Sequence, residues 1–103
     1  MEHVTDGFMM FMREGGAVSA AYMEMVSKGA EASALGRKQD ELAYIAVLAA
    51  IRMTGGLPFH VKSARSLGAT RDEVKSAVLV GLPAVGLQVL DALSVALQSY
   101  DEA

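Results

Sequence analysis

One histidine, His60, has a sequence context that could support proton transfer. It follows the Gly55–Gly56 break and Pro58, so we predict that it lies in the first turn of a helix. On that helix His60 shares a face with Ala64 and Leu67, so it faces inward or into an interface. The helix dipole disfavours added positive charge there, which suits a neutral imidazole that carries a proton or donates a hydrogen bond. A packed histidine bonded to a carbonyl is the alternative interpretation.

Glu41 and Arg52 are the other candidates for chemistry, and both belong to a helix predicted over Arg37–Thr54. Glu41 is a candidate general base, or a group that orients His60; the alternative is a solvated carboxylate near a helix N-terminus, where negative charge is favourable. Arg52 is a candidate for binding a substrate carboxylate. Its alternatives are capping of helix carbonyls and pairing with the face that carries Glu41.

Metal and cofactor sites are not expected. The chain has seven methionines, two histidines and no cysteine. Five of the methionines have the spacing of core residues, which makes core filling a better interpretation than a copper site; they are Met9, Met10, Met12, Met23 and Met25. A zinc site needs ligands that the sequence does not provide. The pairs Gly15–Gly16 and Gly55–Gly56 lack the pattern of a phosphate-binding loop.

Glycine and proline divide the chain into helical segments that must position these residues. Alanine and methionine dominate its apolar content, which favours helices over strands. We therefore predict one all-α domain over residues 1–103, of about six helices. The fifth predicted helix begins with a capping box, in which the Thr70 and Glu73 side chains each bond the backbone N–H of the other residue. The predicted helices cover Thr5–Arg13, Ala17–Lys28 (closed by Gly29), Arg37–Thr54, Pro58 to Gly68, a segment after Thr70, and Pro83–Tyr100.

The third predicted helix is apolar on every side from Leu42 to Ile51. A helix of this kind has to be covered all round. A chain of 103 residues has few helices to spare for that purpose. We therefore expect neighbouring subunits to supply part of the cover.

Composition excludes some classes of function. The net charge of −3 and the scattered basic residues argue against a nucleic-acid binder. The longest apolar run is about half a membrane span, so we expect a soluble protein without a membrane partner. The absence of cysteine favours an intracellular, cytoplasmic location over a secreted one.

Three segments together resemble the carboxymuconolactone decarboxylase family, which includes the alkylhydroperoxidase D branch. They are QDELAYIAVLAA, then FHVKSARSLGATRDEV after a short break, and a last helix headed by GLPAVG. The resemblance covers most of residues 37–102, and the residues before it match only as an additional helical pair. It implies an all-helical domain that assembles into homo-oligomers, as trimers or hexamers.

The resemblance also indicates which chemistry this chain can retain. In the peroxidase branch a Cys-x-x-Cys pair precedes the histidine; the two cysteine positions fall on Met53 and Gly56, while Glu41 and His60 keep the family residues. A thioether forms neither a thiolate nor a disulfide, so peroxidase activity is not expected. The decarboxylase branch lacks the cysteines, keeps the histidine and breaks down a lactone carboxylate.

The sequence therefore predicts a lyase or isomerase acting on a small, carboxylated, lactone-type metabolite. In this hypothesis His60 carries the proton, Glu41 orients it or acts as base, and Arg52 holds a carboxylate. A non-catalytic oligomeric module is the first alternative. A peroxidase that depends on cysteine from a partner protein is the second.

Overall fold

The computed structural model describes residues 3–103, and every regular element within that range is helical, which confirms the all-α prediction. The helices in the N-terminal part are α1 (Asp6–Glu14), α2 (Ala17–Ala32) and α3 (Arg37–Ala50). A short 3-10 helix η1 (Thr54–Gly56) leads into α4 (Leu57–Ser66), which is followed by α5 (Arg71–Leu79). The chain ends with α6 (Leu82–Val85), a second 3-10 helix η2 (Gly86–Gln88) and α7 (Val89–Asp101).

Local side-chain chemistry sets several of these boundaries. Thr5 caps α1 by accepting a hydrogen bond of 3.1 Å from the N–H of Phe8. The capping box predicted for α5 is present: the N–H of Glu73 donates to Thr70 Oγ1 at 3.1 Å, and the N–H of Thr70 donates to Glu73 Oε1 at 2.8 Å. Gly68 ends the preceding helical turn with a φ of +96°, a left-handed conformation that glycine adopts without strain.

Three predicted boundaries were wrong. Helix α2 continues through Gly29 to Ala32, because an exposed glycine inside a helix costs only about 1 kcal/mol relative to alanine. Helix α3 ends at Ala50 and not at Thr54, because Arg52 takes a φ of +63° and turns the chain away. The segment predicted over Pro83–Tyr100 is divided at Gly86, whose φ of +83° separates α6 from α7.

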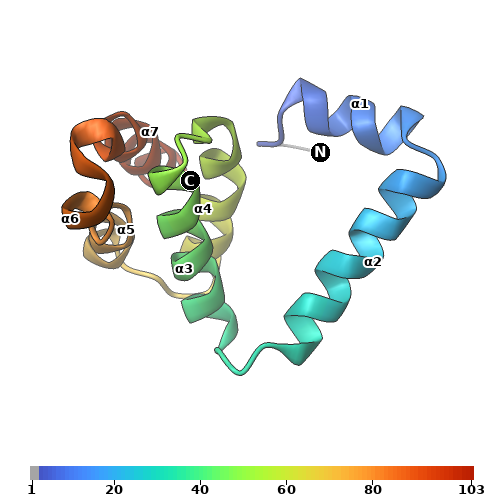
Figure 1. Cartoon of the computed structure of the whole chain (residues 1–103). Coiled ribbons are helices and arrows are strands. Elements are labelled where there is room, and N and C mark those ends of the chain that lie inside the picture. The colour runs from blue at the N-terminus through green and yellow to red at the C-terminus, as the bar shows by residue number, and fades with distance from the viewer. Residues whose placement is uncertain (1–2) are drawn as a thin grey trace.

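Helices α3, α4, α5 and α7 pack together and form the core (Figure 1). The side chains they bury completely are mainly aliphatic and come from all four helices. Polar bonds join the helices at the margins of this core: the Tyr100 hydroxyl donates to the Ala69 carbonyl at 2.9 Å, and Gln88 Nε2 donates to the Ala50 carbonyl at 2.7 Å. The largest fully buried residues are Ile45, Leu57, Val61, Val74, Val78 and Val89.

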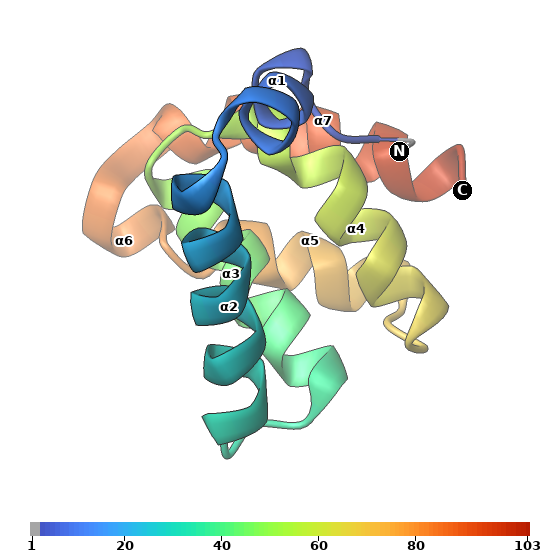
Figure 2. The same cartoon turned by 90° about the vertical axis from the view of Figure 1, so that its right-hand side faces the viewer.

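Helices α1 and α2 form an arm (residues 6–32) that extends away from this core, as the views in Figures 1 and 2 show. No residue of α1 is buried, and in α2 only Ser19 is. The arm contacts the rest of the chain near its two ends. Ser33 Oγ bonds Asp40 Oδ1 at 3.1 Å just after α2, and Thr5, just before α1, lies against Gly55.

The apolar third helix is only partly covered by its own chain. Ile45, Leu48 and Ala49 are buried, whereas Val47 and Ile51 remain 53% and 56% exposed. The need for neighbouring subunits was predicted because the sequence from Leu42 to Ile51 is apolar on every side. The assembly itself stays a prediction.

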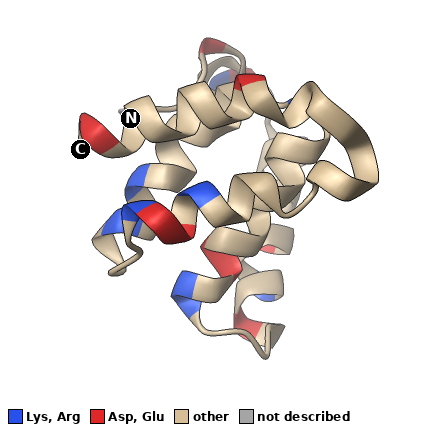
Figure 3. Ribbon diagram, turned by 90° about the vertical axis from the view of Figure 1, so that its left-hand side faces the viewer, with Lys and Arg blue, Asp and Glu red and all other residues tan. Residues whose placement is uncertain are grey.

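A second apolar surface lies where α5 turns into α6. No charged residue occurs between Lys75 and Asp91, and the ribbon of this corner carries no blue or red segment (Figure 3). The stretch Arg71–Asp101 is long and apolar enough to cross a membrane by length and composition alone. In the structure it is folded back on itself, because α5 and α7 pack against each other.

The ion pair between Lys38 and Glu73 gives the first prediction. The two side chains are 3.2 Å apart and join the start of α3 to α5. The pKa of Glu73 lies below its ordinary value of 4.5, chiefly because its carboxylate accepts the backbone N–H of Thr70, and also because Lys38 donates to it. A lowered folded-state pKa stabilises the fold above 4.5, and that stabilisation is lost as the pH falls through the lowered value. Glu73→Gln should therefore lower the urea midpoint at neutral pH, and the difference from the parent chain should vanish on acidification.

Glu14→Gln serves as the matched control, since Glu14 is exposed and makes no ion pair with another described residue. A Glu73→Gln deficit of equal size at neutral and acidic pH would contradict this assignment.

Candidate functional site

His60 and Glu41 meet at the junction of α3 and α4. His60 Nδ1 lies 3.0 Å from Glu41 Oε2 and 3.3 Å from Glu41 Oε1. Helix α4 places His60 at the end of its first turn, with Pro58 at the second helical position, close to the start predicted from the sequence. The two side chains are 25% and 22% exposed, so the pair is sheltered and still reachable from solvent.

The contact orients the imidazole ring. A carboxylate can only accept, so the hydrogen bond requires the proton of His60 to be on Nδ1. Nε2 then carries the free lone pair in the neutral ring, and no described residue forms a hydrogen bond with it. Glu41 therefore holds the ring in one tautomer and leaves Nε2 available for proton transfer.

Two aromatic rings flank the imidazole. The Tyr44 ring centroid lies 4.4 Å from that of His60 with the planes inclined at 52°, and the Phe59 ring lies edge-on at 5.2 Å and 78°. They restrict the ring on the sides that Glu41 does not reach. Tyr44 and Phe59 are nevertheless 43% and 41% exposed, so each presents aromatic surface outward from the site.

The sequence analysis missed Tyr44. It lies three positions after Glu41, and residues at this spacing are neighbours on one helix face, so the signal was present in the sequence. Burial raises the pKa of the Tyr44 phenol above its ordinary value of 10.0, and negative charge on Tyr22 and on Glu41 raises it further. The phenol therefore keeps its proton over the physiological range and can donate a hydrogen bond beside the imidazole.

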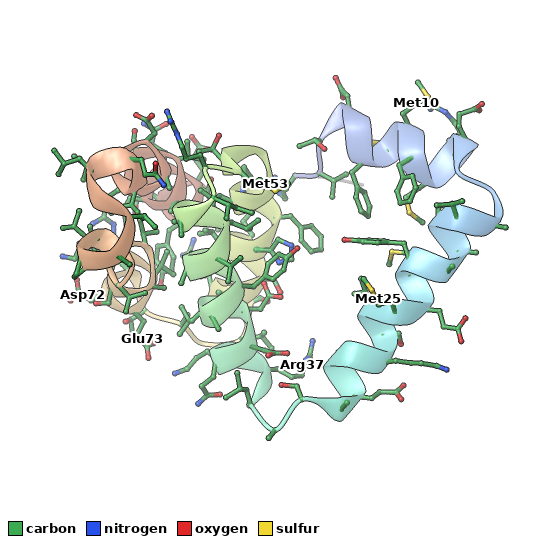
Figure 4. All side chains as sticks on the ribbon, in the orientation of Figure 1. Met10, Met25, Arg37, Met53, Asp72 and Glu73 are labelled. Carbon is green, nitrogen blue, oxygen red and sulfur yellow. The ribbon has the colours of Figure 1, made fainter. Side chains whose placement is uncertain are left out.

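A hollow of about 360 Å³ at the base of the arm reaches Glu41. Glu41 and Arg37 both line it, and His60 does not. Figure 4 shows Arg37 where α2 and α3 converge. A larger hollow, of about 480 Å³, lies between α3 and α5 and has a mainly apolar lining. The first hollow is lined by Ala30, Glu31, Leu35, Arg37, Asp40, Glu41, Ser63 and Leu67.

Arg52 lies elsewhere. It follows the C-terminal end of α3, whereas Glu41 belongs to the second turn of that helix. It is exposed, and its side chain makes no ion pair or hydrogen bond with another residue in the described range 3–103. The structure therefore brings His60 and Glu41 together and leaves Arg52 outside their immediate surroundings.

The two positions that match the cysteines of the peroxidase branch lie in the turn before α4. Met53 is 56% exposed and follows the end of α3, as labelled in Figure 4. Gly56 ends η1, where a Cβ would lie 3.2 Å from Leu48 Cδ1. A side chain at position 56 would therefore require Leu48 to shift, and neither Met53 nor Gly56 supplies a thiolate.

Comparison with known proteins identifies the family. The model of the carboxymuconolactone decarboxylase family matches residues 16–98, most of the chain. The chain belongs to this family. No curated protein and no solved structure matched the chain. The match includes α2, so the carboxymuconolactone decarboxylase domain begins earlier than the sequence segments from residue 37 onward indicated.

The second prediction concerns Tyr44. Its phenol should ionise at a higher pH than a free tyrosine, and Glu41→Gln should bring that pH down by removing one of the charges that oppose the phenolate. Ultraviolet absorbance of the phenolate during a pH titration measures the change, and a Tyr44→Phe variant identifies which transition belongs to this residue. The assignment fails if Glu41→Gln leaves the Tyr44 transition where it was.

Proposed function

We propose that this member of the family is a lyase or isomerase that acts on a small carboxylated lactone or a related metabolite. The observation that carries the proposal is the 3.0 Å contact between His60 Nδ1 and Glu41, which leaves Nε2 without a partner among the described residues. A histidine oriented by a carboxylate is a common arrangement for moving a proton to or from carbon. The family match shows the family, and we choose the substrate class for testing from the family's name.

The chemistry requires one proton transfer at carbon. In decarboxylation the bond between carbon and the substrate carboxylate breaks, CO₂ leaves, and the electron pair remains on the substrate as an enolate. His60, protonated on both nitrogens, donates the Nε2 proton to that carbon and is reprotonated from water. In isomerisation the neutral Nε2 takes a proton from one carbon and returns it to another. Glu41 stabilises the imidazolium in both cases.

Two further side chains have suitable positions for this role. The Tyr44 phenol next to His60 can donate a hydrogen bond to an enolate oxygen, and its raised pKa keeps it protonated for that purpose. Arg37 lines the same hollow as Glu41 and can pair with a substrate carboxylate. We therefore assign carboxylate binding to Arg37 in preference to Arg52.

A non-catalytic module is the second candidate. The observation in its favour is that the hollow reaching Glu41 is not lined by His60. Leu57 is fully buried in the core and Met53 is 56% exposed, whereas Phe59 lies edge-on against the His60 ring. Hydroperoxide reduction remains unsupported, since the chain has no cysteine to form the thiolate and the disulfide.

The third prediction tests the proton carrier. With γ-carboxymuconolactone and related lactones as substrates, His60→Ala should lower kcat by roughly 100- to 10,000-fold, the usual contribution of general acid–base catalysis. Glu41→Gln should lower kcat more than it changes KM, because the amide keeps the ring in place but cannot stabilise an imidazolium. Full activity of His60→Ala would rule out the proposed role. Hydroperoxide turnover by the purified chain would instead favour the peroxidase alternative.

The fourth prediction separates the two arginines. Arg37→Gln should raise KM for a carboxylated lactone by roughly 10- to 150-fold, since a charge-assisted hydrogen bond contributes about 1.5–3 kcal/mol. Arg52→Gln is the matched control and should leave KM close to the parent value. The opposite result would return the binding role to Arg52.

A further inference from the structure

The hollow that reaches Glu41 lies about one helical turn from the contact between Glu41 and His60. On α3, Arg37 precedes Glu41 by four residues, and on α4, Ser63 follows His60 by three; residues at these spacings share a helix face. Arg37, Glu41 and Ser63 all line the hollow, and Figure 4 shows Arg37 where α2 and α3 converge. A ligand in the hollow therefore lies along the face of α4 that carries His60.

The charged side chains around the hollow are unequal in number. Arg37 is the one cationic side chain among the described residues of the lining, whereas Glu31, Asp40 and Glu41 contribute three carboxylates. The guanidinium of Arg37 makes no ion pair or hydrogen bond with another residue in the range that the structure describes. The hollow thus offers a ligand one available cation within a lining of net negative charge.

A ligand with two carboxylates fits this lining poorly. Arg37 can neutralise one of them, and a sphere of 360 Å³ is about 9 Å across, so the second lies within about that distance of a lining carboxylate. At the effective dielectric near a protein surface, one such repulsion lowers affinity by roughly tenfold. A protonated His60 does not supply the missing positive charge, because Glu41 already pairs with it.

The carboxylate that Arg37 holds is also a poor leaving group. Decarboxylation converts an anionic carboxylate into neutral CO₂, so a charge-assisted bond from Arg37 stabilises the substrate more than the transition state. Removal of a proton from another atom leaves that carboxylate ionised, and the bond to Arg37 then persists through the whole reaction. Loss of CO₂ therefore requires a second carboxylate, which is the charge that the lining disfavours.

We propose that the substrate is a lactone with a single carboxylate, and that this chain isomerises it without releasing CO₂. The inference rests on the proposed function and decides between its two reactions. The selective groups are Arg37, which holds the one carboxylate, and the three acidic side chains of the lining, which repel a second. Neutral His60, oriented by Glu41, is the proton carrier.

The proton transfer can be written for a but-2-enolide that carries a carboxymethyl group on ring carbon 4. Nε2 of His60 takes the proton from carbon 4, and the electron pair passes through the double bond between carbons 2 and 3 to the lactone carbonyl, which gives a dienolate. The same nitrogen then returns a proton to carbon 2. The double bond comes to lie between carbons 3 and 4, and no atom is gained or lost.

Two lactones that differ by one carboxylate test the charge preference. They are 4-carboxymethylbut-2-en-4-olide and γ-carboxymuconolactone, in which a carboxylate replaces the hydrogen on carbon 4. In calorimetry with His60→Ala, which removes the proton carrier, we expect the single anion to bind roughly tenfold more tightly. Glu31→Gln in the same background should reduce this preference, because it removes one lining carboxylate. Glu14→Gln is the matched control, with the same change of charge outside the hollow, and should keep it.

Turnover by the parent chain tests the reaction. Proton NMR should show conversion of the single anion to the but-3-enolide. Release of CO₂ from γ-carboxymuconolactone should have a kcat/KM lower by roughly tenfold or more, as the binding preference requires. Circular dichroism checks that each variant is folded.

The outcomes separate this inference from the proposed function. Equal or tighter binding of γ-carboxymuconolactone, or its faster turnover, would overturn the inference, and CO₂ release would then support the lyase reaction of the proposed function. Preferred binding of the single anion without conversion would support the charge preference and contradict the isomerisation together with the proposed function. Failure of both lactones to bind the folded chain would show that the hollow is not the substrate site.

Discussion

The packing of α3 against α4, α5 and α7 is the constraint on which the rest of the structure depends. Ile45, Leu48 and Ala49 are removed from water by these three helices, and their positions fix the rotation of α3 about its axis. Glu41 is four residues before Ile45, so the same rotation aims its carboxylate at α4. Val61 of α4 is fully buried next in sequence to His60, which fixes the imidazole in the same way. The distance between the acid and the histidine is thus set by aliphatic packing.

The resulting site has the glutamate and the histidine but not the two cysteines. A carboxylate, an imidazole and a phenol are close together, which is sufficient for proton transfer and for stabilising an enolate. Sulfur chemistry is absent because Met53 and Gly56 occupy the positions that would provide it. The chain belongs to the family although it has no thiols. The lyase and isomerase reactions are the ones proposed because they do not require a thiol.

Much of the fold could be predicted from local signals. Thr70 with Glu73, the proline at position 58 and Gly68 mark helix ends whose causes lie within a few residues, and the structure has them. The approach of Glu41 to His60 was predictable only as a possibility, because it depends on how two helices cross. The predicted end of α3 was wrong because Arg52 adopts a left-handed conformation, which is uncommon for residues other than glycine. Arg37 was overlooked as a site residue because its hollow is formed partly by Ser63 and Leu67, which are distant from it in sequence.

The division between arm and core also affects which part of the molecule unfolds locally. The core helices occupy one uninterrupted stretch from Arg37 to Asp101, and their buried side chains contact one another. Helices α1 and α2 contribute almost nothing to that cluster. Their backbone amides can exchange with solvent through local opening that leaves the cluster intact, at a free energy well below that of global unfolding. The N-terminal third of the chain is consequently expected to open separately, so the hydrogen-exchange protection of its amides reports on the arm and not on the stability of the core.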